Sequence, residues 1–391
     1  MYADPNIAAF GDTYYIYATT DGIPGWGGNE FYVWKSKDLV NWERAEEPFL
    51  TLDGENGNVP WASGNAWAPT IIERDGKYYF YFSGHNDSVD RKTIGVAVAD
   101  HPEGPFTAEP EAMILNNEEV TSGQAIDPAA FHDPESGKYF LYWGNGKPVY
   151  AELADDMVSL KPGTIKEMHG LNDYREATFV NYRDGRYHLT YSIDDTGSPN
   201  YRIGYATSDS PHGPWTYRGV ILEKDPSLGI LGTGHNSVLQ VPGTDDWYMV
   251  YHRFAIPDGA GHKRETTIDR LTFDEDGFME PVIPTLESVD PQFIDADQSP
   301  DPEPDPGDGS EDPGDGSEDP GDGSEDPSDE GNGSGDEQPI ADPDGDSNAG
   351  KQLPRTGADN IALIALALSL LAAGGAAVWA RGRERAGELT E

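Results

Sequence analysis

Residues 173–191 read Asp-Tyr-Arg-Glu-Ala-Thr-Phe-Val-Asn-Tyr-Arg-Asp-Gly-Arg-Tyr-His-Leu-Thr-Tyr. Two short runs of aromatic and other β-favouring residues, 179–182 and 186–191, flank the dipeptide Asp184-Gly185. Asp-Gly favours the tight type I′ turn that joins two antiparallel strands. The stretch therefore predicts a β-hairpin, with Glu176 at the entrance of its first strand.

The same hairpin pattern recurs along the chain. In each repeat a tyrosine opens the second strand after a turn, at Tyr14, Tyr78, Tyr139, Tyr187 and Tyr248. A third strand with its own turn is predicted in each unit, over residues 31–42, 94–106, 149–160, 203–215 and 267–279. Repeats of three or four strands with almost no helical pattern are typical of propeller blades. We therefore predict an all-β fold, a five-bladed β-propeller over residues 1–294.

One residue stands at the start of the first strand of each predicted blade. These residues are Asp4, Ala68, Asp127, Glu176 and His235. The first strands of a propeller line its central channel, so we expect three carboxylates and a histidine to meet at the axis. Each has an ordinary interpretation, because Asp-Pro is a common turn element and a single Glu or His is usually solvated or hydrogen-bonded. Their recurrence at one place in the blade favours a functional role.

The charge of the chain excludes one class of partner. The 391 residues carry a formal net charge of −45 at pH 7. Nucleic-acid binding depends on Lys and Arg that neutralise phosphates, so such an acidic chain is not expected to bind nucleic acid. The chain has no cysteine, which excludes disulfides and cysteine-based zinc sites.

Aromatic residues are abundant and suit a carbohydrate ligand, because their faces stack on sugar rings. Most tryptophans are expected to pack between blades. Trp26 differs, because it lies in the loop 22–28, which is too rich in glycine to form a strand. We predict that Trp26, Trp67 and Arg253 bind substrate.

Residues 295–350 consist mainly of Pro, Gly, Asp, Glu and Ser, and contain no Lys or Arg. The segment has almost no apolar residue to bury and its charges repel one another, which predicts an extended, disordered linker. An acidic tail that binds calcium or a basic protein is the alternative.

The C-terminal residues 351–391 contain three successive signals. Residues 353–357 read Leu-Pro-Arg-Thr-Gly, an apolar run covers 361–380, and arginines follow within 381–385. The run is long enough to form a transmembrane helix, and the arginines fit its cytoplasmic side. A plain membrane anchor is one interpretation.

The three signals together resemble the sorting signal that sortase recognises in Gram-positive bacteria. The resemblance implies cleavage between Thr356 and Gly357 and covalent attachment of an extracellular protein to peptidoglycan, with the membrane only as a sorting intermediate. Met1 is followed by neither the basic nor the apolar region of an export signal, so we expect the given N-terminus to be truncated or mis-started.

The three acids suit the hydrolysis of a glycosidic bond with inversion. That reaction needs a carboxylate base and a carboxylic acid about 6.5–9.5 Å apart. The acid must stay protonated near neutral pH, which a neighbouring negative charge promotes. A third carboxylate therefore has a role.

Five short motifs together resemble glycoside hydrolase family 43, whose members are five-bladed propeller enzymes acting mostly on arabinose- and xylose-containing plant polysaccharides. The motifs are Ala3-Asp4-Pro5, Trp67-Ala68-Pro69, Ile126-Asp127-Pro128, Arg175-Glu176-Ala177 and Gly234-His235-Asn236-Ser237. The resemblance implies that Asp4 is the general base, that Glu176 is the general acid, and that Asp127 raises the pKa of this acid and orients it. It also implies that His235 coordinates a calcium ion, directly or through water.

The chain departs from the family pattern at two places. Ala177-Thr178 follows the acid, where the family often has Gly-Pro or Ala-Pro, and the linker begins where many of its xylosidases carry a β-sandwich. The first departure leaves the subfamily open. Without the β-sandwich the propeller loops must close the site unaided, so we expect an arabinofuranosidase or arabinanase. We also expect a monomer that uses no organic cofactor. The alternatives are a β-xylosidase, a galactan-acting exo-hydrolase and a non-catalytic sugar-binding propeller.

Overall fold

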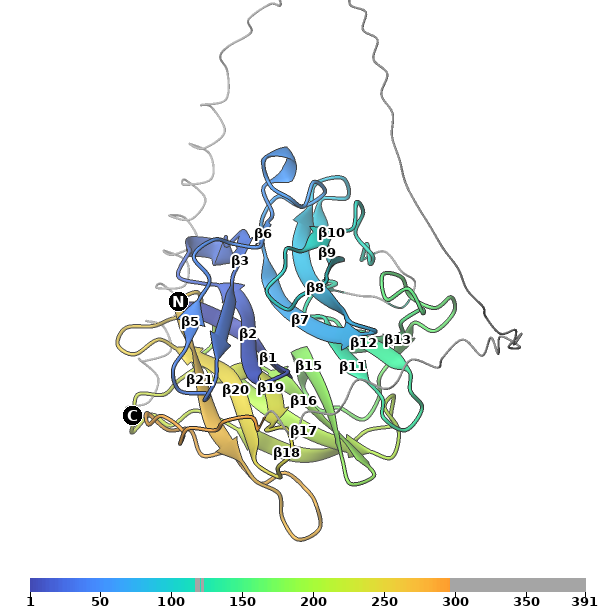
Figure 1. Cartoon of the computed structure of the whole chain (residues 1–391). Helices are drawn as coiled ribbons and strands as arrows, with labels where there is room; N and C mark the ends of the chain where they lie inside the picture. The colour runs from blue at the N-terminus through green and yellow to red at the C-terminus, as the bar shows by residue number, and fades with distance from the viewer. Residues whose placement is uncertain (117–119, 121–122, 296–391) are drawn as a thin grey trace, which may run out of the picture. The chain divides into compact units, whose positions relative to one another are not determined.

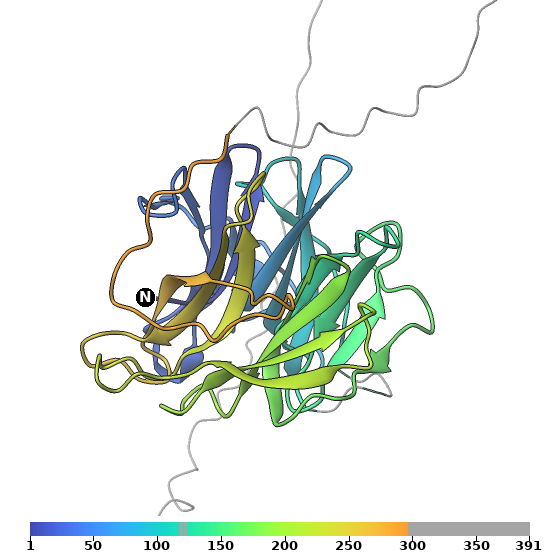
Figure 2. The same cartoon turned by 90° about the horizontal axis from the view of Figure 1, so that it is seen from below.

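The computed structural model describes residues 1–116, 120 and 123–295. In this part of the chain, antiparallel sheets are arranged around a central axis, which confirms the predicted five-bladed propeller (Figure 1, Figure 2). No helix among the described residues is long and apolar enough to cross a membrane. The predicted transmembrane helix at 361–380, the sorting signal and all but the first residue of the linker lie outside the described residues.

Each blade is one sheet built from consecutive strands. The first blade contains β1 (Tyr2–Phe10), β2 (Thr13–Thr20), β4 (Val33–Ser36) and β5 (Glu43–Arg44). The second contains β7 (Trp67–Arg74), β8 (Lys77–Asn86), β9 (Arg91–Ala99) and β10 (Thr107–Ala108). The third contains β11 (Ala129–His132), β12 (Tyr139–Trp143), β13 (Val149–Glu152) and β14 (Lys166–Glu167).

The last two blades follow the same order. The fourth contains β15 (Tyr174–Arg183), β16 (Arg186–Ile193), β17 (Arg202–Ser208) and β18 (Thr216–Leu222), and the fifth contains β19 (Gly234–Gln240), β20 (Trp247–Phe254) and β21 (Arg264–Leu271). A two-stranded ribbon, β3 (Glu30–Phe31) with β6 (Leu50–Thr51), and two short 3-10 turns, Pro24–Trp26 and Gly54–Asn56, complete the described elements.

The turn at Asp184-Gly185 has the predicted conformation. Both residues have positive φ, 50° and 80°, as a type I′ turn requires, and the turn joins β15 to β16. Both strands extend beyond the predicted runs. Only the part nearest the turn has a clear β pattern in the sequence, whereas the added ends contain the polar residues Arg175, Glu176 and Ser192.

The hydrophobic core is divided among the seams, which are the contacts between neighbouring blades. One cluster joins the first and last blades, where Tyr14 and Ile16 pack with Leu239 and Val250. The Ser237 hydroxyl reinforces this seam, because it accepts the N–H of Ile7 at 3.1 Å and donates to the carbonyl of Pro5 at 2.9 Å. Side-chain packing and these hydrogen bonds therefore close the ring, without a strand shared between the two ends.

Candidate active site

The inner strands place one residue with a left-handed backbone at the axis. In four blades this residue has φ between 42° and 59°, and it is Asp4, Ala68, Asp127 or His235. In the fourth blade the left-handed residue is Ala177, with φ 63°. Glu176 therefore lies one residue before the position that the other four share, whereas the sequence analysis placed it at that same position.

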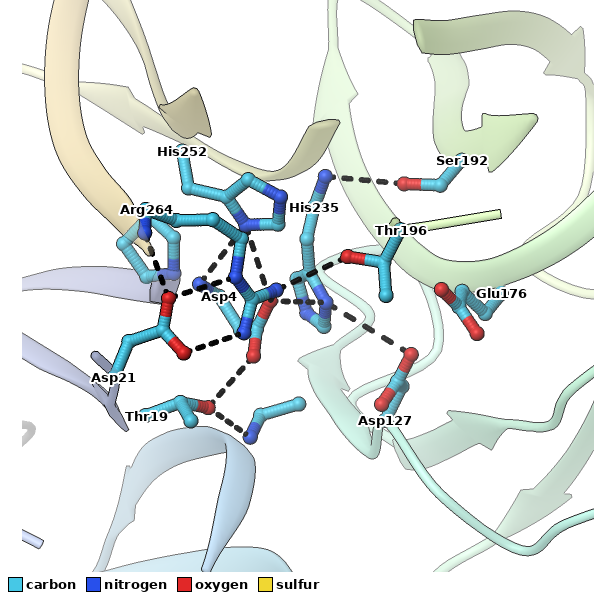
Figure 3. Close-up of polar contacts among 12 residues, drawn as sticks. Asp4, Thr19, Asp21, Asp127, Glu176, Ser192, Thr196, His235, His252 and Arg264 are labelled. Carbon is cyan, nitrogen blue, oxygen red and sulfur yellow. Dashed lines mark hydrogen bonds and ion pairs between the residues drawn. The ribbon is translucent and has the colours of Figure 1, made fainter. Parts of the chain in front are cut away.

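Strand pairing explains the difference. The inner strands lose register after Ala3, Trp67, Glu176 and Gly234, and each resumes pairing three residues later. Glu176 thus corresponds to Ala3 of the first blade and not to Asp4. Because adjacent residues of a strand point to opposite sides, the Glu176 carboxylate approaches the axis from a different direction than those of Asp4 and Asp127 (Figure 3).

Four of the five left-handed residues are held by a side chain of the preceding blade. The N–H groups of Ala68, Asp127 and His235 donate to hydroxyls of Thr19 at 2.8 Å, Ser83 at 3.0 Å and Ser192 at 3.0 Å. The Asp4 N–H donates to His252 Nδ1 at 3.2 Å. Buried N–H groups need such partners, so these hydrogen bonds fix the positions of the axial residues.

The Asp4 carboxylate is buried and surrounded by donors (Figure 3). Arg264 Nη1 donates to its Oδ1 at 2.9 Å, and the Thr19 hydroxyl donates to its Oδ2 at 2.7 Å. Burial alone would raise the pKa of Asp4, but the positive charge of Arg264 holds it well below its usual range. Asp4 is therefore ionised at neutral pH and able to accept a proton.

Arg264 is itself fixed by a second buried acid. Asp21 Oδ2 accepts the Arg264 backbone N–H at 2.8 Å and its Nε at 3.0 Å, and Asp21 Oδ1 accepts Nη2 at 3.3 Å. Nη1 remains for Asp4 and for the Thr196 hydroxyl, which it meets at 3.1 Å. Burial acts to lower the pKa of Arg264, but Asp4 and Asp21 together raise it, so the guanidinium stays charged.

Glu176 lies in a different environment from Asp4. Its Oε1 accepts the Tyr201 hydroxyl at 2.9 Å, and its Oε2 accepts Asn145 Nδ2 at 2.5 Å. Burial raises the pKa of Glu176, although Tyr201 and Arg175 act in the opposite direction. A carboxyl with a raised pKa is suited to donate a proton near neutral pH.

Asp127 shares this tendency to hold a proton. Burial raises its pKa well above the usual range, and the negative charges of Glu176 and Asp4 raise it further. Because Asp127 and Glu176 repel one another when both are ionised, they titrate as a pair that keeps one proton to higher pH than either would alone. This pair lies opposite the ionised Asp4.

The axial residues line a pocket of about 170 Å³. Its lining consists of Asp4, Trp26, Trp67, Gln124, Ile126, Asp127, Asn145, Arg175, Glu176, Asp195, Thr196, His235 and Arg264. The structure therefore brings together the three predicted acids, the predicted histidine and two of the three predicted substrate-binding residues. Arg253 does not line this pocket, because its guanidinium donates to Glu265 at 2.9 Å and to the Thr285 carbonyl at 2.7 Å.

Sequence reasoning missed Arg264, Asp21, Tyr201 and Asn145. Asn145 had a weak signal, since it stands between two glycines directly after the predicted second strand of its blade. Arg264 had none, because it opens the third strand of the last blade and not one of the repeated inner strands.

The surroundings of His235 bear on the predicted calcium ion. Its Nδ1 lies 3.5 Å from Asp4 Oδ1 and 3.8 Å from Asp127 Oδ2, and burial lowers the pKa of His235 to about 4, so the ring is uncharged at neutral pH. Among the described residues, no group of three or more His, Asp or Glu side chains is arranged to hold a metal. Calcium prefers oxygen ligands, and Asp4 is already engaged by Arg264, so these side chains do not form a direct calcium site and we assign the ion no step.

Comparison with known proteins gives two family matches. Residues 1–279 match the model of glycosyl hydrolases family 43, and residues 345–385 match that of the LPXTG cell wall anchor motif. A β-D-galactofuranosidase of Aspergillus niger is 34% identical over 308 residues, which cover 74% of this chain and 84% of the fungal protein. A xylosidase/arabinosidase of Bacteroides ovatus is 29% identical over 325 residues, covering 70% of this chain and 93% of its own length.

Solved structures agree with these matches. A family 43 β-xylosidase/α-arabinofuranosidase from a compost metagenome, determined with xylotriose in a calcium-free form, superposes with a TM-score of 0.62 at 29% identity. The alignment covers 73% of this chain and 96% of that one. An arabinoxylan arabinofuranohydrolase of Bacillus subtilis superposes with a TM-score of 0.64 at 26% identity, covering 75% and 68% of the two chains.

Proposed function

Since the chain belongs to glycosyl hydrolases family 43 and is therefore a glycosidase, we propose that it hydrolyses arabinose-containing plant polysaccharides or their oligosaccharides with inversion. The observation that carries the proposal is the contrast between two carboxyl groups in one pocket. The pKa of Asp4 is lowered and that of Glu176 is raised, so one is a base and the other an acid at the same pH.

In the proposed reaction, Asp4 accepts a proton from a water molecule as the water oxygen attacks the anomeric carbon. Glu176 donates its proton to the glycosidic oxygen, and the bond between that oxygen and the anomeric carbon breaks. Attack on the face opposite the leaving group inverts the anomeric configuration. A negative charge on Asp127 disfavours ionisation of Glu176, so Glu176 stays protonated until it donates the proton to the leaving oxygen.

We propose an α-L-arabinofuranosidase as the first candidate. Support comes from the relatives that are named as arabinosidases, and the described residues that line the pocket all belong to the propeller. A β-D-galactofuranosidase is the second candidate, because a galactofuranosidase is 34% identical to this chain. Hydrolysis of nitrophenyl arabinofuranoside, galactofuranoside and xyloside by the purified chain separates these activities.

Two variants test the roles of the carboxyl groups. Asp4→Asn and Glu176→Gln are each expected to lower kcat by about a hundredfold or more, because positioned acids and bases contribute on that order. A substrate with an activated leaving group needs little protonation, so it should partly restore the rate of the Glu176 variant and not that of the Asp4 variant. Equal losses on both kinds of substrate would contradict these roles.

We propose that the cell-wall anchor motif holds this enzyme outside a Gram-positive cell. Sortase would cleave between Thr356 and Gly357 and join Thr356 to peptidoglycan, and residues 295–350 would then separate the propeller from the wall. The match of residues 345–385 to the anchor model supports this proposal. Cell fractionation tests it, because Thr356→Ala should move the protein from the wall to the membrane fraction.

A further inference from the structure

We propose that the loop 22–28, through Trp26, closes one side of the pocket so that only the non-reducing end of a sugar chain enters. This inference rests on the proposed function and names the part of the chain that limits the enzyme to single terminal sugars. Trp26 is then a residue that determines specificity, and its role goes beyond stacking on a sugar ring.

Trp26 first joins the loop 22–28 to the second blade. Its φ is 56°, and its carbonyl accepts Trp67 Nε1 at 2.7 Å and Asn65 Nδ2 at 3.2 Å. Lys92 adds to this contact, because its ammonium lies 5.1 Å from the Trp67 ring and donates to Asn65 Oδ1 at 2.6 Å. The backbone of Trp26 is thus fixed beside the aromatic wall formed by Trp67.

The Trp26 side chain reaches the fifth blade. Its Nε1 donates to the carbonyl of Gly261, between β20 and β21, at 3.0 Å. Its ring meets His262 edge-on, with centroids 6.1 Å apart, and the Gly22 N–H donates to the His262 carbonyl at 2.8 Å. Two hydrogen bonds and one ring contact therefore join the loops of the first and fifth blades.

The fourth blade completes the connection. A Cβ added to Gly261 would lie 2.8 Å from the Cα of Gly197, in the loop between β16 and β17, and 3.3 Å from the Trp26 indole. The two loops can approach this closely because residue 261 is a glycine. In the same loop as Gly197, Asp195 accepts Arg175 Nη2 at 3.0 Å, so the contacts continue to the residue before Glu176.

These contacts join the pocket rim across four of the five blades. A groove that binds the middle of a chain needs two openings, one for each direction of the chain. Among the described residues, the part of the rim outside these contacts belongs to the third blade, where Gln124 and Asn145 line the pocket and Asn145 donates to Glu176. The leaving group would therefore extend from the pocket beside the acid, and the sugar on the other side of the bond must be terminal.

The size of the pocket agrees with this arrangement. Its volume is about 170 Å³, below the roughly 300–1,000 Å³ of sites that hold drug-sized ligands. A space of this size suits one sugar ring.

Product analysis with the full chain tests the proposal. The substrates are α-1,5-linked arabinotriose and the same trisaccharide with a benzyl ether on its non-reducing terminal O5, together with β-1,4-linked xylotriose and its O4-benzyl counterpart. We expect release of monosaccharide from the free trisaccharide and at least about a hundredfold lower kcat/KM on the blocked one. Disaccharide released from the reducing side of the blocked substrate at a comparable rate would overturn the proposal.

Variants of the loop 22–28 locate the cause. Trp26→Ala removes both the ring and the hydrogen bond to Gly261. The preference for the free end, which is the ratio of kcat/KM on the free substrate to that on the blocked substrate, should therefore fall toward one. Trp26→Phe keeps a ring without the N–H and should give an intermediate preference. Ile23→Ala changes an exposed residue of the same loop that does not line the pocket, and should retain the wild-type preference. An unchanged preference in Trp26→Ala, with its melting temperature near that of the wild type, would rule out the role of Trp26.

Failure of the proposed hydrolase function can be distinguished from failure of the inference about Trp26. A chain that cleaves none of the four trisaccharides and none of the three nitrophenyl glycosides would contradict the hydrolase roles of Asp4 and Glu176. Calorimetric titration of the same protein then tests the closed side of the pocket without catalysis. A closed rim predicts that the free trisaccharide binds and that the blocked one binds at least about tenfold more weakly. Equal affinities would overturn the inference.

Discussion

At the scale of single residues, Arg264 lowers the pKa of Asp4, the proposed base. An opposite charge at hydrogen-bond distance lowers the pKa of a carboxyl by about 1–3 units. Arg264→Met is therefore expected to raise the pKa of Asp4 and to move the acid limb of the kcat/KM profile upward by a similar amount. The measurement is kcat/KM against pH on nitrophenyl arabinofuranoside.

The control for Arg264→Met addresses stability. Removing the guanidinium leaves Asp21 as a buried acid without its partner, which is strongly destabilising. The double variant Arg264→Met/Asp21→Asn removes both charges, so it should unfold at a higher temperature than the single variant while keeping the shifted acid limb. An acid limb in both variants that coincides with that of the wild type would show that Arg264 does not set the pKa of Asp4.

Asp127 supports a prediction of opposite sign to that for Asp4, because its pKa is raised and that of Asp4 is lowered. Its pKa is raised in the folded state, so its favourable contribution to stability is present at low pH and is lost as the pH rises through the raised value. Asp127→Asn lacks this loss, and its melting temperature relative to the wild type should increase from pH 5 to pH 9. The variant should also move the alkaline limb of the rate profile toward acid, because Glu176 loses a negative neighbour. A constant difference in melting temperature, with an unchanged alkaline limb, would indicate that Asp127 only positions Glu176.

The residues of the site differ in how visible they are in the sequence. Asp4, Asp127, Glu176 and His235 could be predicted because each stands at the start of a repeated strand pattern. Arg264 could not, because its partner Asp4 is 260 residues away and the two meet only when the ring closes. Tyr201 and Asn145 reach Glu176 from separate loops, 25 and 31 residues away in the chain, and only the glycines around Asn145 mark either position in the sequence.

At the scale of elements, the bulge of the inner strands determines where each axial side chain points. In three blades the left-handed residue is followed by proline, as in Asp4-Pro5, Ala68-Pro69 and Asp127-Pro128, which makes the position recognisable in the sequence. In the fourth blade Ala177 is followed by Thr178, so no proline marks the bulge. This is why sequence reasoning found Glu176 but placed it one residue away from its actual place in the blade.

Hydrogen bonds between blades should contribute to both stability and activity. The Thr19 hydroxyl accepts the Ala68 N–H and donates to Asp4, whereas the Ser83 hydroxyl accepts the Asp127 N–H. Thr19→Val and Ser83→Ala each leave a buried N–H without a partner and should lower the free energy of unfolding by about 1–3 kcal/mol. Denaturant titration measures this change.

The rate profiles of these two variants should differ. Thr19→Val also removes a donor from the base, so it alone is expected to raise the pKa of Asp4 and to shift the acid limb. A shift of the acid limb in Ser83→Ala as large as that in Thr19→Val would mean that general loosening of the blades, and not the lost donor, is the cause.

At the scale of the whole molecule, the repeat explains how much of the fold could be predicted. Five units with the same turns and tyrosines suffice to predict the blades, because each sheet can bury its faces only against its neighbours. The pairing of the first and last blades through Ser237 and Ile7 could not be predicted, since it depends on the curvature of the complete ring. The contacts of Trp26 with Gly261 and Gly197 depend on the same closure.

Catalysis and attachment should be separable, because they depend on different parts of the chain. The described residues that line the pocket all lie within the range from Asp4 to Arg264, whereas the anchor motif lies within residues 345–385. A chain that ends at Asp295 is therefore expected to hydrolyse soluble oligosaccharides with a kcat/KM within about twofold of that of the full chain, since distant sites usually act independently. Its melting temperature should also match that of the full chain, because the described residues after β21 remain, including Ile294, which packs in the seam between the first and last blades.

The matched control for this truncation ends the chain at residue 280, which removes Ile294 from that seam and also the Thr285 carbonyl that accepts Arg253 Nη1. This shorter chain should melt at a lower temperature, because buried apolar contacts of the closing seam are lost. Loss of activity in the chain that ends at Asp295, at an unchanged melting temperature, would show that the C-terminal residues take part in binding substrate, and would contradict their proposed role as linker and anchor.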